Sequence, residues 1–119
     1  MKRPMLIFTI CFAIALISLT SVTGKTQSPR VIEITASRFA FTPNEITIKK
    51  GEQVTLEVRS KDVDHGLEIE ELGVRIEVKK GSPTDVKLNP TSEGTFEGKC
   101  AHFCGTGHGS MTFTVHVVE

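Results

Sequence analysis

A glycine-rich stretch near the C-terminus, CAHFCGTGHGSM over residues 100–111, gathers most of the metal-binding side chains of this sequence. Its candidate side-chain ligands are two thiols, an imidazole and a thioether, from Cys100, Cys104, His108 and Met111. A second imidazole, His65, lies upstream in the short sequence DVDHG. Soft thiolate and thioether donors combined with imidazole select copper among the common metals. These residue types therefore predict a copper site.

The number of cysteines bears on the number of metal ions. One cysteine, two histidines and a weak axial methionine would suffice for a single blue-copper ion. Two cysteines, four positions apart, also allow both thiolates to bridge two copper ions. One copper can then take one histidine and Met111, and the other can take the second histidine and a backbone oxygen. Glycines at positions 105, 107 and 109 would let the loop turn tightly around such a cluster.

Two simpler interpretations use the same cysteines. A disulfide between Cys100 and Cys104 is compatible with an exported protein, but it leaves the histidines, Met111 and the glycines unexplained. A zinc site with two cysteines and two histidines fits the donors. Met111 and the β-rich pattern of the chain argue against zinc.

The segments that must position these ligands alternate apolar and polar residues, which is typical of half-buried strands. Turn-forming residues separate them, and no convincing helical period is present. The sequence therefore predicts an all-β sandwich or barrel. The segments expected as strands are 31–34, 39–41, 45–49, 54–58, 67–70, 74–78, 86–88 and 111–117.

The strand pattern also predicts where two ligands lie. Met111 shares the phase of Phe113 and Val115, so its side chain should point into the core. His65 stands at the start of an expected strand. Strand ends on one side of a sandwich can bring it to the loop of residues 100–111.

The N-terminus differs in character from the rest of the chain. Lys2 and Arg3 precede an apolar run, a pattern typical of a secretory signal peptide or, if retained, a membrane anchor. We expect residues 1–24 to be this leader, 25–30 a linker and 31–119 the exported domain, with membrane association through residues 5–22. The domain would be periplasmic or at the outer face of the cytoplasmic membrane. A formal net charge of zero argues against a nucleic-acid partner.

The loop and the upstream Asp-His-Gly resemble the binuclear CuA site of cytochrome c oxidase subunit II. The segment from Phe39 to Ile46, followed by Lys50-Gly51-Glu52, resembles the opening strands of a cupredoxin domain. The resemblance covers the whole exported part and implies a cupredoxin-like Greek-key β-sandwich or barrel. It also implies the ligand set: His65 and His108 as terminal ligands, Cys100 and Cys104 as bridges, Met111 as axial ligand, and the main-chain carbonyl of His102.

Two features depart from that family. Glu or Gln usually stands where this chain has His102, and in many oxidases that Glu also reaches a magnesium ion. Most subunit II proteins have two membrane helices and an aromatic run with Trp, whereas this chain has one apolar segment and no Trp. The sequence is thus similar to a short, single-anchor subunit II or to a free-standing exported relative.

The resemblance implies single-electron transfer from a cytochrome c or another small carrier to subunit I of a haem–copper oxidase. No Ser–His–Asp or paired-carboxylate motif stands out, and a fully ligated copper centre leaves no open position for a substrate. We therefore expect no catalysis by this chain alone. Two alternative functions remain open: an exported protein for copper storage or delivery, and a stand-alone soluble electron carrier.

Overall fold

The structure is a computed structural model that describes residues 29–119. The expected leader (1–24), most of the linker and the membrane-associating run (5–22) lie outside the described residues. Within residues 29–119, no helix has the length and apolarity needed to span a bilayer. The described elements are β1 (Arg30–Ser37), β2 (Ala40–Thr42), β3 (Glu45–Lys49), β4 (Val54–Ser60), β5 (His65–Ile69), the 3₁₀ helix η1 (Glu70–Leu72), β6 (Val74–Val78), β7 (Thr84–Leu88), β8 (Gly94–Lys99), the 3₁₀ helix η2 (His108–Ser110) and β9 (Thr112–Val118).

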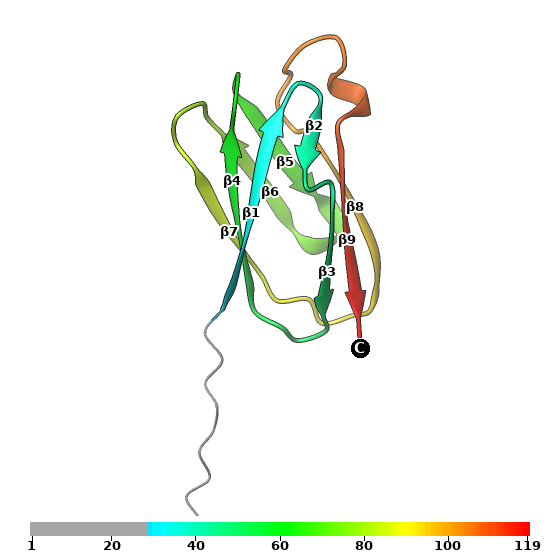
Figure 1. The fold of residues 1–119 in the computed structure, drawn as a ribbon. Helices are drawn as coiled ribbons and strands as arrows, with labels where there is room; N and C mark the ends of the chain where they lie inside the picture. The colour runs from blue at the N-terminus through cyan, green and yellow to red at the C-terminus, as the bar shows by residue number, and fades with distance from the viewer. Residues whose placement is uncertain (1–28) are drawn as a thin grey trace, which may run out of the picture.

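The strands form two sheets packed face to face (Figure 1). One sheet has the order β2-β1-β4-β7 and the other β3-β9-β8-β5-β6. Two pairs are parallel, β1 with β4 and β3 with β9, and neighbouring strands are often distant in the chain. The chain therefore crosses between sheets, and the prediction of an all-β sandwich is confirmed.

The core lies between the sheets and follows the predicted alternation. Along β9, Phe113, Val115 and Val117 are buried while Thr112 is exposed. Phe113 meets Phe41 edge to face, with ring centroids 5.9 Å apart. Such interdigitated apolar faces are what holds two sheets together.

One strand, β8, was not expected from the sequence. Its inward positions include Phe96 and Gly98, so the apolar alternation is too short to be recognised. Gly98 allows β8 to approach β5 closely, because a Cβ at that position would lie 2.8 Å from Cγ1 of Ile69.

The pairing of β5 with β8 decides where the candidate ligands meet. Glu68 of β5 lies opposite Lys99 of β8 in an antiparallel pair. The start of β5, which is His65, therefore lies beside the end of β8, where the loop of residues 100–111 begins. Figure 1 shows this loop, in orange, at the end of the sandwich where β8 ends and β9 begins.

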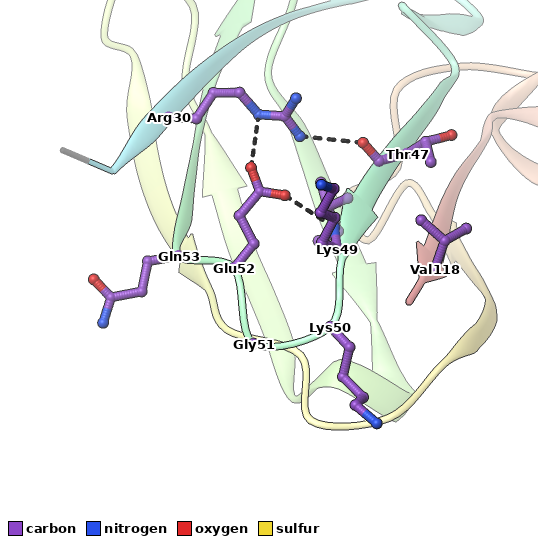
Figure 2. A pocket seen from close by; sticks show the side chains of 9 residues that line it. Arg30, Thr47, Lys49, Lys50, Gly51, Glu52, Gln53 and Val118 are labelled. Carbon is purple, nitrogen blue, oxygen red and sulfur yellow. Dashed lines mark hydrogen bonds and ion pairs between the residues drawn. The ribbon is translucent and has the colours of Figure 1, made fainter. Parts of the chain in front are cut away.

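The opposite end of the sandwich carries a hollow of about 870 Å³ where β3 turns into β4 (Figure 2). Among its lining residues, Arg30 forms an ion pair with Glu52, with 3.2 Å between Nε and Oε1. Nη2 of Arg30 also donates a hydrogen bond of 3.1 Å to the carbonyl of Thr47. A second oxygen of Glu52 accepts a 2.9 Å bond from the amide of Lys49. These contacts join β1 to β3 and to the turn that follows it, and none of the candidate metal ligands lines the hollow.

Candidate metal centre

Three sulfur atoms lie together beneath the loop. The Sγ atoms of Cys100 and Cys104 are 3.9 Å apart, and Sδ of Met111 is 3.9 Å from Sγ of Cys104. All three side chains are buried, and the expectation that Met111 points inward is confirmed. Both cysteines are free thiols in this structure, since their separation far exceeds the length of a disulfide bond.

Each thiol has an imidazole nitrogen and one further donor atom beside it. Nδ1 of His65 lies 3.9 Å from Sγ of Cys100, whose other neighbour is the main-chain oxygen of His102, 3.1 Å away. Nδ1 of His108 lies 3.8 Å from Sγ of Cys104, whose other neighbour is Met111. The structure thus brings together donor atoms from all six residues expected from the sequence, while the side chain of His102 is exposed.

The ring of His65 is fixed by Asp62. Nε2 of His65 lies 2.7 Å from Oδ1 of Asp62. Burial alone would raise the pKa of Asp62, but hydrogen bonds from the Arg38 amide, His65 and the Val63 amide outweigh it and lower this pKa from 3.8 to about 2. The ionised carboxylate accepts a hydrogen bond from Nε2–H, so in a neutral ring Nδ1 carries no proton and is free to bind a metal.

Gly66 explains how the loop reaches His65. A Cβ at this position would lie 3.0 Å from the carbonyl oxygen of Ile76 and 3.1 Å from both Cβ of Ala101 and the amide of His102. Glycine lets the loop backbone come this close to β5, because a Cβ here would push these neighbours away by a few tenths of an ångström. The five residues from Asp62 to Gly66 therefore include the anchor of the ring, the ring itself and the glycine that gives the loop its space.

The Cys104 thiol carries its proton at neutral pH in the metal-free protein. Burial and the adjacent Cys100 thiol raise the pKa of Cys104 from 9.0 to about 11. A metal ion binds the thiolate, so it must displace this proton. Such a buried thiol is a poor nucleophile in the absence of a metal, which argues against thiol chemistry on a substrate.

The donor set fits copper. His65, Cys100 and Cys104 place their ligand atoms within 4.8 Å of one another, and Met111 adds a fully buried thioether. Soft sulfur combined with imidazole is the donor combination that copper prefers. Residues 100–111 contain no Asp, Glu, Lys or Arg, so this loop offers no carboxylate ligand.

Phe103 forms the outer surface of the centre. Its side chain is 74% exposed, and its ring centroid lies 5.7 Å from that of His108. An apolar ring therefore covers one candidate ligand at the protein surface.

Comparison with known proteins gives the family. The cupredoxin-like domain family matches residues 7–113 of the sequence. The chain belongs to this family. This cupredoxin-like chain is also 30% identical over 88 residues to cytochrome c oxidase subunit 2 of Thermus thermophilus, a match that covers 74% of the chain and 65% of the relative. It is homologous to that subunit, and it spans less than two thirds of the length of such relatives.

Solved structures have the same fold. The periplasmic domain of subunit II of the cytochrome oxidase of Bradyrhizobium japonicum matches with a TM-score of 0.72 and 20% identity, over 78% of this chain and 86% of the other. A chain from a heme-copper terminal oxidase dimer matches with a TM-score of 0.69 and 25% identity, over 79% and 68% respectively. The cupredoxin-like sandwich expected from the sequence is thereby confirmed.

Proposed function

We propose that this cupredoxin-like chain transfers single electrons through a binuclear copper centre of the CuA type. The supporting observation is the pair of thiols 3.9 Å apart, each with its own imidazole nitrogen beside it. A single blue-copper ion needs only one thiolate, so the second cysteine supports a two-metal centre. Bound copper would supply a site that gains and loses one electron.

The residues of the centre then have distinct tasks. Cys100 and Cys104 would hold the copper ions as thiolates, and Nδ1 of His65 and Nδ1 of His108 would supply one imidazole ligand each. Met111 and the carbonyl of His102 complete the set as weak donors. Because these groups are held by β5 and by the loop that joins β8 to β9 in the same sheet, their positions should change little between redox states, which favours rapid transfer.

The homology with oxidase subunit 2 supports a proposal for the electron donor and the electron acceptor of this chain. We assign the electron donor as a cytochrome c or another small carrier, and the acceptor as haem in subunit I of a haem–copper oxidase. The chain would act outside the cytoplasm, in the periplasm or at the outer face of the cytoplasmic membrane, as the expected leader implies. Phe103, exposed beside His108, offers an apolar surface close to the centre.

Metal reconstitution of the full chain tests this function. We expect two coppers per chain, a purple colour, and an electron paramagnetic resonance spectrum in which one unpaired electron couples to both copper nuclei. Reduced cytochrome c should then reduce the loaded protein. One copper with a simple blue spectrum would contradict the binuclear centre. Preference for a single colourless zinc ion would revive the zinc interpretation, and copper that cannot be reduced and reoxidised would favour storage or delivery.

Replacing the axial donor should tune the centre without emptying it. Met111→Leu conserves volume in a fully buried position, so the fold should remain intact. Loss of the thioether removes electron density that stabilises the more positive, oxidised state, and the reduction potential should rise. Voltammetry and metal analysis check this: two coppers with a higher potential are expected. Loss of all copper would show that Met111 holds the metal rather than tuning it.

A further inference from the structure

The turn between β1 and β2 touches the metal centre although it carries none of its donor atoms. Nε of Arg38 donates a 2.9 Å hydrogen bond to the carbonyl oxygen of Cys104. The amide of the same residue donates a 2.7 Å bond to Oδ2 of Asp62. Figure 1 shows this turn, in cyan, at the same end of the sandwich as the orange ligand loop. One residue is therefore bonded to both segments that carry the candidate ligands.

The hydrogen bond donated by the backbone amide of Arg38 acts on the first imidazole, His65, through Asp62. Asp62 receives the Arg38 amide on Oδ2 and Nε2 of His65 on Oδ1. The backbone of the turn thus fixes the carboxylate that fixes the ring. This connection does not depend on the side chain at position 38, whereas the bond to Cys104 does.

The ring of Phe39 packs against the loop segment that carries Cys104 and His108. A Cβ at Gly107 would lie 2.5 Å from Cγ of the Phe39 ring, and a Cβ at Gly105 would lie 3.0 Å from Cε1 and Cζ of that ring. The ring therefore lies directly on the loop backbone between Cys104 and His108. Glycine at position 107 is required by this close approach, because a real Cβ would overlap the ring.

We propose that Arg38 and Phe39 are positioning residues that hold the Cys104–His108 half of the centre against the His65–Cys100 half. Arg38 fixes the carbonyl of Cys104, and Phe39 fixes the backbone that follows it. The loop is thereby held in a binding-competent shape before any metal arrives. The inference rests on the proposed function for its copper readouts, and on the metal-free protein for its structural readout.

A double-mutant cycle on the full chain tests Phe39. Gly107→Ala should weaken copper binding about 10- to 100-fold, the range typical when groups that orient metal ligands are disturbed, because the new methyl overlaps the ring. In a Phe39→Ala background the same change should cost much less, since the overlapping atoms are gone. Gly109→Ala is the matched control, because a Cβ there meets nothing within 4 Å. Affinity is measured by competition with a copper(I) chelator, together with the absorption spectrum.

A second variant separates the two bonds of Arg38. Arg38→Met should lower the affinity for copper and shift the absorption bands that arise from charge transfer between the Cys104 thiolate and copper. The ¹⁵N chemical shifts of the His65 ring should stay unchanged. Arg38→Lys, which keeps a donor, should recover part of the loss. A merely structural role would lower the thermal midpoint of all forms equally and leave the spectrum of the loaded protein unaltered.

Amide hydrogen exchange in the metal-free protein keeps this inference separate from the proposed function. Phe39→Ala and Arg38→Met should speed exchange at the His108 amide, which bonds to the carbonyl of Gly105 at 3.1 Å. Faster exchange would support positioning even if the wild type bound a metal other than copper. Equal costs of Gly107→Ala in both backgrounds, or exchange unchanged by either variant, would overturn it.

Discussion

Alanine at position 65 should abolish or strongly weaken copper binding, whereas alanine at position 102 should leave the metal centre nearly intact. His65 is fully buried, with Nδ1 facing the Cys100 thiol and Nε2 held by Asp62. Its removal takes away a terminal ligand and admits water in its place. His102 approaches the centre through its main-chain oxygen, which alanine retains. Copper counts and absorption spectra of the two loaded variants should therefore differ sharply.

The two substitutions differ in burial, so stability must be measured beside metal content. His65→Ala also opens a cavity, and thermal unfolding of the metal-free variants shows whether the sandwich survives. His65→Gln keeps more of the volume but offers no imidazole, and it should lose copper as the alanine variant does. A bleached centre in His102→Ala with a normal one in His65→Ala would mean that the coordinating imidazole lies within the loop.

Much of this arrangement could be predicted from residue types and spacing alone. The inward side of Met111 follows from its phase with Phe113 and Val115, because alternation along a strand fixes which face a side chain takes. The meeting of His65 with the loop follows from strand ends gathering at one end of a sandwich. Both predictions depend only on local periodicity and on the layered architecture.

Other parts of the centre could not be foreseen in that way. Arg38 bonds to a residue 66 positions away, and nothing in the sequence around it marks this contact. Phe39 begins a segment expected as a strand, and its partly buried ring packs against the core and also lies on the ligand loop. The glycines of the loop were a signal, since they indicated crowding or a tight turn. They could not identify the aromatic ring that causes the crowding at Gly107.

The difference between the glycines illustrates this limit. All three in the loop were expected to serve tight turning. Gly105 has a positive φ of 137° and fits that expectation, whereas Gly107 is needed for the close approach of Phe39. Gly109 has neither a positive φ nor a close neighbour. Residue identity alone does not separate backbone geometry from packing.

Serine at position 104 should reduce the copper content from two ions to one at most and abolish the purple colour. Sγ of Cys104 lies centrally in the cluster, 3.9 Å from Sγ of Cys100, 3.8 Å from Nδ1 of His108 and 3.9 Å from Sδ of Met111. A serine hydroxyl is a hard donor that stays protonated at neutral pH, so it cannot bridge two copper ions as a thiolate does. Metal analysis and paramagnetic resonance of the loaded variant measure the effect.

The remaining cysteines provide the comparison. Cys100→Ser should also lose one copper, since in the proposed centre each thiolate would serve both ions. The ion that remains would have a different set of neighbours and therefore a different spectrum. Cys11→Ser is the control, because Cys11 belongs to the expected leader and should be irrelevant to the metal count. If Cys104→Ser kept two coppers and the purple spectrum, the thiol of Cys104 would not be a bridge. Both copper ions would then be held without the second thiolate, by Cys100 and the two imidazoles.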